Sequence, residues 1–298
     1  MKIRPLLHGA LLTASLSSLA VPAAAADTGT VRVVSHEQDT ASVAAYWTVS
    51  RMASATPERI RSSGKTPDLA GPPAGTPTSK RSGGSKVVGA VFYSNGSGSH
   101  YCTGSVIHTA GRNAVLTAGH CLYDANKHRY FSNIAFVPDY NTSHPRPYGV
   151  WPVRQMWLDG RWTGHGDPDL DFGFAAVRTV GGRHIENVVG ANKFRATQGF
   201  HKWVTVIGYP QKRYYPADRP IQCSNYTFKH STFQQGFDCK GYYDGTSGSP
   251  WIMNYNSHTQ SGYVIGALGG FQAGGATDWR SYAAVFDNDA ATLLTKVN

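Results

Sequence analysis

The sequence predicts an all-β protein built as a sandwich or as barrels. Short runs rich in β-branched and aromatic residues recur along the chain, turn residues separate them, and no helical periodicity lies between them. The composition agrees, because 33 Gly and 16 Tyr are typical of a turn-rich β protein, and 41% hydrophobic residues suffice for a core. The predicted strands are Val87–Tyr93, Tyr101–Ile107, Ala114–Ala118, Ile134–Val137, Phe172–Val177, Trp203–Ile207, Ile221–Phe228, Trp251–Met253, Tyr263–Leu268 and Tyr282–Phe286.

One helix is predicted at the end of the chain. Residues Asp287–Asp289 supply a cap, and Ala290–Val297 follows with Leu293, Leu294 and Val297 on one face.

Residues 1–26 have the pattern of a secretory signal peptide. Lys2 and Arg4 give a positive start, Leu6–Leu19 is an apolar stretch, and Val21–Ala26 is a small-residue cleavage region. Cleavage is expected after one of Ala24 to Ala26, and no later segment approaches the length of a membrane span. The sequence therefore predicts a secreted, extracellular protein with no membrane association once the signal is removed.

Residues 27–85 differ in composition from the rest of the chain. Ser62–Pro67 and Gly71–Pro77 are rich in Gly, Ser and Pro, which predicts a flexible region without a core. Lys80 and Arg81, followed by Ser82–Ser85, form a dibasic site suited to proteolytic removal. We expect a pro-segment, and the alternative is an N-terminal tail that is never cut.

The positive charge is dispersed. The whole chain carries +10, and from Lys86 onward 19 Lys and Arg stand against 13 Asp and Glu, a net charge of +6. Because no basic run stands out, this charge favours a soluble surface rather than a nucleic-acid interface.

Four cysteines, Cys102, Cys121, Cys223 and Cys239, suit an oxidising compartment. Three pairings are possible, and the economical one joins Cys102 to Cys121 and Cys223 to Cys239. With neither CxxC nor HExxH present, no metal site and no cofactor are predicted.

The first chemical motif is Gly245–Pro250, which reads Gly-Thr-Ser-Gly-Ser-Pro. Small residues on both sides of Ser247 present its hydroxyl at a sharp turn that a substrate carbonyl can approach. The backbone N–H groups of Gly245 and Ser247 could converge there as an oxyanion hole.

Two further motifs complete a candidate triad. His120 ends a predicted strand and stands beside Cys121. A general base needs its imidazole held rigidly, and a disulfide one residue away would provide that anchor. Asp171 directly precedes an apolar strand, so it is the carboxylate expected to be buried against His120, while Asp167 and Asp169 are expected to remain solvated. The chain order His, Asp, Ser differs from the order in α/β-hydrolases, and the G-x-S-x-G elbow is absent because residue 249 is serine.

Together, Cys102–Ile107, Thr117–Cys121, Asp171 and Gly245–Pro250 resemble the chymotrypsin-like (trypsin-like) serine peptidases. The likeness is greatest to secreted bacterial and actinobacterial members, including the glutamyl-endopeptidase-like enzymes, and it spans roughly residues 87–298. It implies two antiparallel six-stranded β-barrels with the triad in the cleft between them. The first barrel would cover residues 86–190 with His120 and Asp171, and the second 191–298 with Ser247, the C-terminal helix packing against the second barrel.

The chain departs from the family pattern at two places. Animal members carry an aspartate before the serine that pairs with the new N-terminus, whereas this chain has Thr246, which forms no ion pair. We therefore expect the pro-segment to inhibit the enzyme or to assist folding. The specificity pocket implied by the resemblance holds no Asp or His, which favours a neutral or hydrophobic substrate side chain; its residues are Gly241, Tyr242, Leu268, Gly269 and Gly270.

The sequence thus predicts a secreted serine endopeptidase, synthesised as a zymogen, that acts as a monomer on proteins or peptides through an acyl-enzyme. Two alternatives remain: a catalytically weak or inactive binding protein on the same fold, and an esterase or lipase with the same triad.

Overall fold

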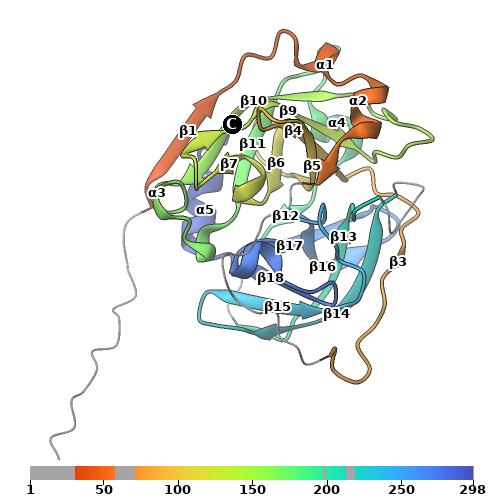
Figure 1. Ribbon diagram of the computed structural model, residues 1–298, viewed down its shortest axis with the longest axis vertical. Coiled ribbons are helices and arrows are strands. Elements are labelled where there is room, and N and C mark those ends of the chain that lie inside the picture. The colour runs from red at the N-terminus through yellow and green to blue at the C-terminus, as the bar shows by residue number, and fades with distance from the viewer. Residues whose placement is uncertain (1–30, 58–70, 197–198, 213–218, 298) are drawn as a thin grey trace, which may run out of the picture. The chain divides into compact units, whose positions relative to one another are not determined.

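The computed structural model describes residues 31–57, 71–196, 199–212 and 219–297, so the predicted signal peptide lies outside the described residues. Two large antiparallel sheets dominate, which confirms the predicted all-β fold. The strands of the first sheet lie in the upper half of Figure 1 and those of the second sheet in the lower half.

The first sheet closes into a six-stranded barrel. Its strands follow the order β10-β11-β6-β5-β4-β9, and β9 pairs again with β10 through Phe136 and Trp151. The interior is apolar, and Phe92, Phe136 and Phe174 are fully buried. The strands are β4 (Val88–Ser94), β5 (Ser99–Ile107), β6 (Ala114–Thr117), β9 (Ser132–Pro138), β10 (Trp151–Asp159) and β11 (Gly173–Val177).

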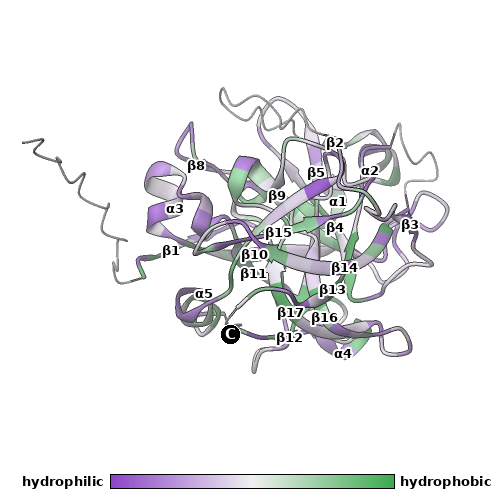
Figure 2. Cartoon of the chain, turned by 90° about the horizontal axis from the view of Figure 1, so that it is seen from below, coloured by the Kyte–Doolittle hydropathy of each residue, from purple (hydrophilic) through white to green (hydrophobic). Residues whose placement is uncertain are grey.

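The second sheet has the order β17-β16-β13-β14-β15-β18. A bridge between Leu268 and Ala283 also joins the end of β17 to β18. Figure 2 shows hydrophobic residues along β13 and β17 and hydrophilic residues on α3 (Gly160–His165). The strands are β12 (Lys193–Phe194), which pairs with β17, and β13 (Trp203–Gly208), β14 (Ile221–Lys229), β15 (Gln234–Asp238), β16 (Pro250–Asn256), β17 (Ser261–Ala267) and β18 (Arg280–Ala284).

Shorter elements connect these strands. They are β7 (Tyr123–Asp124), β8 (Arg129–Tyr130), α4 (Ile185–Val189) and the 3₁₀ turns η1 (Gly119–Cys121), η2 (Pro168–Leu170) and η3 (Phe271–Gly274).

The two disulfides follow the economical pairing. Cys102 bonds Cys121, which ties β5 to η1, and Cys223 bonds Cys239 in the second sheet. In an oxidising compartment each bridge is expected to restrict the unfolded chain.

The C-terminal helix α5 (Asn288–Leu294) forms as predicted, with the Asp287 side chain accepting a hydrogen bond from the N–H of Asp289. Its packing differs from the expectation, because α5 contacts β10 of the first barrel. Ala290 and Leu293 bury their side chains in that core, and Asp289 accepts a hydrogen bond from Arg161 of α3. Apolar burial and this ion pair together hold the helix on the first barrel.

Residues 31–57 pack against the first barrel, so the flexible region that was expected over 27–85 does not include them. Trp47 and Met52 are fully buried in the first core, and the Trp47 indole packs 5.2 Å from the Phe92 ring. Large apolar side chains supply this burial, and the sequences Ser62–Pro67 and Gly71–Pro77 contain none. The elements here are β1 (Val33–Glu37), which pairs with β10, α1 (Val43–Tyr46), α2 (Val49–Ser54) and β2 (Thr56–Pro57), which pairs with β5; β3 (Lys80–Arg81) pairs with β14.

Candidate active site

His120 lies in η1, directly after β6, and its side chain is 7% exposed. Cys121 fixes this turn to β5 through its disulfide. Gly119 packs against the Trp162 indole so closely that a Cβ there would lie 2.8 Å from Nε1. The turn therefore has little freedom to move the imidazole.

Asp171 is fully buried and accepts three hydrogen bonds. Its Oδ1 accepts from the backbone N–H of His120 at 2.9 Å, and its Oδ2 lies 2.7 Å from His120 Nδ1. The N–H of Gly270 reaches the same Oδ2 at 2.8 Å. These partners satisfy a carboxylate that would otherwise be costly to bury.

The neighbouring acids behave differently from the expectation. Asp167 caps η2 by accepting from the N–H of Asp169. Asp169 is half-buried and accepts a hydrogen bond from the Gln234 side chain. Burial raises the pKa of the Asp169 carboxyl, so Asp169 is not a solvated loop charge.

The Ser247 turn lies against the strands that carry His120. The N–H of Thr103 donates to Ser247 O at 2.7 Å, and the Thr103 hydroxyl donates to Gly245 O. A Cβ on Gly248 would lie 2.1 Å from Thr103 O and 3.0 Å from Ala118 N, so only glycine fits there. The Ser247 turn therefore contacts the first barrel at Ala118, two residues before His120.

Two N–H groups of this turn have no acceptor among the described residues, those of Gly245 and Ser247. The N–H groups of Thr246 and Gly248 instead bond Tyr243 O and Leu268 O. Gly245 has φ +96°, a left-handed conformation that favours glycine. The unbonded pair is the one that the sequence predicts as an oxyanion hole.

On the imidazole, Nε2 is buried and has no hydrogen-bond partner in the described part of the chain. Because Nδ1 faces Asp171, Nε2 is the nitrogen left to exchange a proton with a nucleophile. Thr246 is also buried, and its hydroxyl donates to Tyr243 O.

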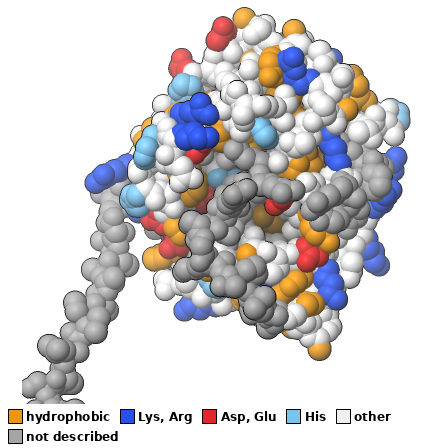
Figure 3. Space-filling view, in the orientation of Figure 1, with side chains coloured by type: hydrophobic (Ala, Val, Ile, Leu, Met, Phe, Trp, Pro, Cys, Tyr) orange, Lys and Arg blue, Asp and Glu red, His pale blue; other side chains and the backbone are white. Residues whose placement is uncertain are grey.

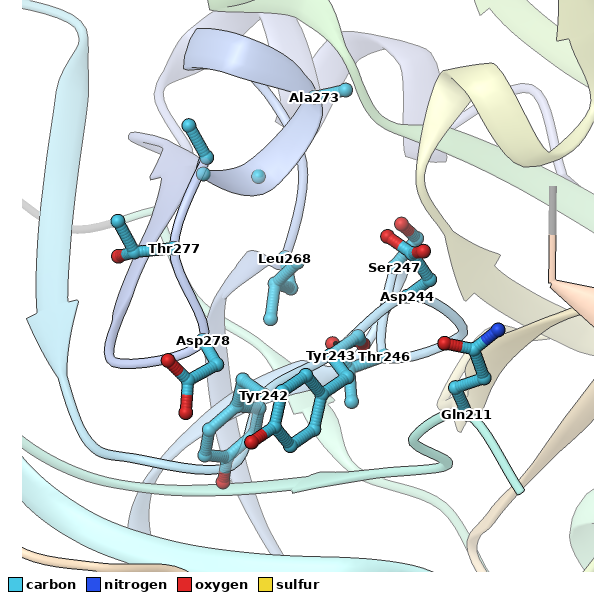
Figure 4. Close-up of a pocket in the computed structure, with 13 residues that line it drawn as sticks. Gln211, Tyr242, Tyr243, Asp244, Thr246, Ser247, Leu268, Ala273, Thr277 and Asp278 are labelled. Carbon is cyan, nitrogen blue, oxygen red and sulfur yellow. Dashed lines mark hydrogen bonds between the residues drawn. The ribbon is translucent and has the colours of Figure 1, made fainter. Parts of the chain in front are cut away.

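A cavity of about 150 Å³ opens beside Ser247 (Figure 4). Of the five residues predicted for the specificity pocket, Tyr242 and Leu268 line it. Gly241 instead donates its N–H to Asp278 O, while Gly269 and Gly270 lie against Asp171. The sequence did not predict the other lining residues, which are Gln211, Tyr243, Asp244, Thr246 and residues 273–278.

Comparisons with known proteins bear on the fold and on part of the first barrel. The family model described as Trypsin matches residues 75–161. A curated relative, the "Extracellular metalloprotease" of Bacillus subtilis (strain 168), is 29% identical over 189 residues. The match covers 60% of this chain and 55% of that protein, so the chain spans about half the length of the curated relative.

Solved structures share the fold. The protease Anisep from Arthrobacter nicotinovorans has a TM-score of 0.65 at 23% identity, covering 74% of this chain and 98% of its own. The thermostable serine protease AL20 from an extremophilic microorganism has a TM-score of 0.62 at 25% identity, covering 70% and 94%. A Glu endopeptidase structure has a TM-score of 0.60 at 17% identity, covering 74% and 97%.

The name of the Bacillus protein raises the question of a metal. Among the described residues, one group of three potential ligands lies close together: Cys102, His120 and Cys121. The two sulfurs are bonded to each other, so neither is a thiolate, and the group does not fit a zinc ion.

Within the described ranges, no helix is both long and apolar enough to span a bilayer.

Proposed function

Because this chain carries a trypsin-like domain on the fold of bacterial serine proteases, we propose that it is a secreted serine endopeptidase with the triad His120, Asp171 and Ser247. One observation carries the proposal: Asp171 holds His120 Nδ1, and the opposite Nε2 is buried without a partner. Most buried polar atoms have a partner, so an unpartnered Nε2 on a ring whose Nδ1 is held by a buried carboxylate is the arrangement that a general base needs.

The proposed reaction begins with Ser247. Its Oγ attacks the scissile carbonyl carbon while His120 Nε2 takes the hydroxyl proton. The carbonyl oxygen becomes an oxyanion, which the N–H groups of Gly245 and Ser247 stabilise. Asp171 stabilises the imidazolium formed at this stage.

The remaining steps return the enzyme to its starting state. The imidazolium gives its proton to the leaving amine, the C–N bond breaks, and an acyl-enzyme on Ser247 remains. Water then attacks the ester with His120 again as base, which releases the acid and restores the serine hydroxyl. Protein and peptide substrates follow from this chemistry.

The proposal includes export and processing. The signal-like residues 1–26 support secretion, and the name of the Bacillus relative describes an extracellular protein. The side chains of Lys80 and Arg81 are exposed, and cleavage there requires the two-residue strand β3 to separate from β14. Because Trp47 and Met52 complete the first core, we assign residues 31–57 a role in folding the first barrel.

Labelling with an organophosphorus reagent tests the chemistry. We expect one label per chain, located at Ser247 by peptide mass, and none in Ser247→Ala. Ser249→Ala is the matched control, because the Ser249 hydroxyl is fully buried and donates to Thr246 O; this variant should keep the label. A folded, processed protein without label would instead favour a binding protein. Hydrolysis of a lipid emulsion without cleavage of casein would indicate an esterase.

A further inference from the structure

The charged side chains that line the cavity beside Ser247 are negative. Asp244 and Asp278 line it, and none of its described lining residues is Lys, Arg or His. Arg280, two residues beyond Asp278, is engaged elsewhere, because its guanidinium forms two hydrogen bonds of 2.7 and 2.8 Å with Asp238. The Lys212 ammonium donates to the carbonyls of Met52 and Ala53 in α2. Among the residues that the structure describes, the cavity therefore holds two carboxylates and no cation that pairs with them.

The two carboxylates occupy different positions. Asp244 is exposed at the rim, next to Gly245. Asp278 is half-buried, and Figure 4 shows it across the pocket from Ser247, with Leu268 between them. Within the described ranges, the Asp278 side chain has no hydrogen bond and no ion pair. Solvent screens a rim charge more than a half-buried one, so Asp278 has the stronger effect on a bound ligand.

The backbone holds Asp278 firmly in place. Its carbonyl accepts the N–H groups of Gly241 at 2.8 Å and Tyr242 at 2.9 Å, which joins it to the segment leading to Ser247. The next carbonyl, of Trp279, accepts from Cys239, which is itself in a disulfide. The position of the carboxylate relative to the nucleophile is therefore set by the fold.

A substrate side chain that enters this cavity passes Leu268 before it reaches Asp278. An apolar side chain would displace water from an unpaired carboxylate, which is unfavourable. An acidic side chain would meet two like charges. A long side chain with an apolar stem and a cationic end satisfies both parts of the cavity, since its methylene groups contact Leu268 and its charge pairs with Asp278.

On this basis we propose that the enzyme cleaves after lysine or arginine, with Asp278 as the residue that selects the cation. The proposal rests on the proposed function. It differs from the neutral or hydrophobic preference expected from Gly241 and Leu268, because Asp278 adds a negative charge to the cavity.

Peptide substrates that differ only in the residue before the scissile bond test the preference. With Arg or Lys there, we expect kcat/KM to exceed the values for Leu and Glu by about 100-fold or more, since a cation and its carboxylate partner are both desolvated. Asp278→Asn, which keeps the shape, should remove about 100-fold from the Arg and Lys values and change the Leu value only a few-fold. Asp244→Asn removes the rim charge instead, and we expect it to lower the Arg and Lys values by a few-fold at most, because solvent screens that charge.

A binding measurement makes the test independent of catalysis. Benzamidine, a small aromatic cation, should bind Ser247→Ala measurably in a calorimeter, and the double variant with Asp278→Asn should bind it at least about tenfold more weakly. Thermal unfolding of each variant checks that the fold is retained.

The outcomes separate the two proposals. A labelled enzyme that prefers Leu or Glu, or one in which Asp244→Asn alone removes the Arg preference, overturns the role of Asp278 and leaves the proposed function intact. Absence of organophosphorus labelling refutes the proposed function. In that case the benzamidine measurement still tests the role of Asp278. Equal benzamidine binding with and without the Asp278 carboxylate would contradict that role.

Discussion

Asp171 contacts His120 twice, once through the backbone N–H and once through the imidazole Nδ1. The first contact fixes the position of the residue and the second fixes the orientation of the ring. Together they favour the tautomer that carries its proton on Nδ1 and leaves Nε2 as a hydrogen-bond acceptor.

Asp171→Asn keeps the shape of the side chain but favours the wrong tautomer, because an amide nitrogen would face Nδ1. We expect kcat to fall by about 10⁴-fold, because the wrong histidine tautomer cannot accept the proton of the serine hydroxyl. Turnover per organophosphorus-titrated site is the measurement. A loss below tenfold would mean that Asp171 has only a structural role.

The disulfide between Cys102 and Cys121 supports the same geometry from the other side. Replacing both cysteines by serine should lower the free energy of unfolding by about 3 kcal/mol, because the bridge closes a short loop. It should also lower kcat, since η1 loses its anchor to β5. The matched control removes Cys223 and Cys239, which should cost similar stability in urea titrations but affect kcat for a small ester less. An equal effect of the two pairs on kcat would contradict this assignment.

Trp47 provides the test of the N-terminal segment. Trp47→Ala should destabilise the full chain by about 3–5 kcal/mol, because a large, fully buried ring leaves a cavity in the first core. Trp203→Ala is the control, since Trp203 is 51% exposed on β13, and it should cost less than about 1 kcal/mol. Chemical denaturation of both variants measures the loss in the free energy of unfolding. Equal losses in the two variants would mean that the N-terminal segment is not docked on the first barrel.

His230 predicts a pH effect on stability. His230 is exposed as a whole, but its ring packs on Phe271 and Tyr282. Desolvation there, followed by the charge of Arg280, lowers the pKa of this imidazole against the opposing charge of Asp169. A lowered pKa in the folded state means that the unfolded chain binds the proton first, so stability is present above about pH 6.5 and is lost as the pH falls through the lower folded value. His230→Phe, which keeps the ring contacts with Phe271 and Tyr282, should flatten the fall in Tm between pH 7 and pH 5. His258→Gln, on an exposed turn, is the control, and an unchanged slope in His230→Phe would refute the assignment.

The proposed preference for basic residues predicts that the enzyme processes itself after Arg81, where both dibasic side chains are exposed. Ser247→Ala should accumulate uncut, and trace amounts of the active enzyme should cleave it in trans. N-terminal sequencing is expected to find Ser82 at the new end. Processing of Ser247→Ala in the absence of active enzyme would assign the cut to another protease.

The contact between Asp171 and His120 could be predicted from a few consecutive residues and from chain order, and the structure shows it. The role of Ser247 as their nucleophile stays a prediction. The order of residues 31–57 could not be predicted in the same way, because the Gly- and Pro-rich stretches that follow dominate the composition of residues 27–85. A closer signal was present in Val43 and Trp47, four positions apart, which place two apolar side chains on one side of a helical turn.

Asp278 was missed for a different reason. Its position depends on how the loop after β17 returns to Gly241 and Tyr242, more than thirty residues earlier, and no local pattern indicates that pairing. The packing of α5 on the first barrel is likewise set by a distant ion pair, between Arg161 and Asp289.

The pairing of β1 with β10 also affects solubility. Residues Gln155–Asp159 of β10 pair with β1 along one edge, and Gln155–Trp157 also pair with β11 along the other edge. An enzyme that lost residues 31–57 would present the backbone of Gln155–Asp159 to solvent as an open sheet edge, a surface on which another strand can add. Retention of the cleaved segment and resistance to aggregation are therefore coupled: conditions that release the segment should also promote self-association of the enzyme.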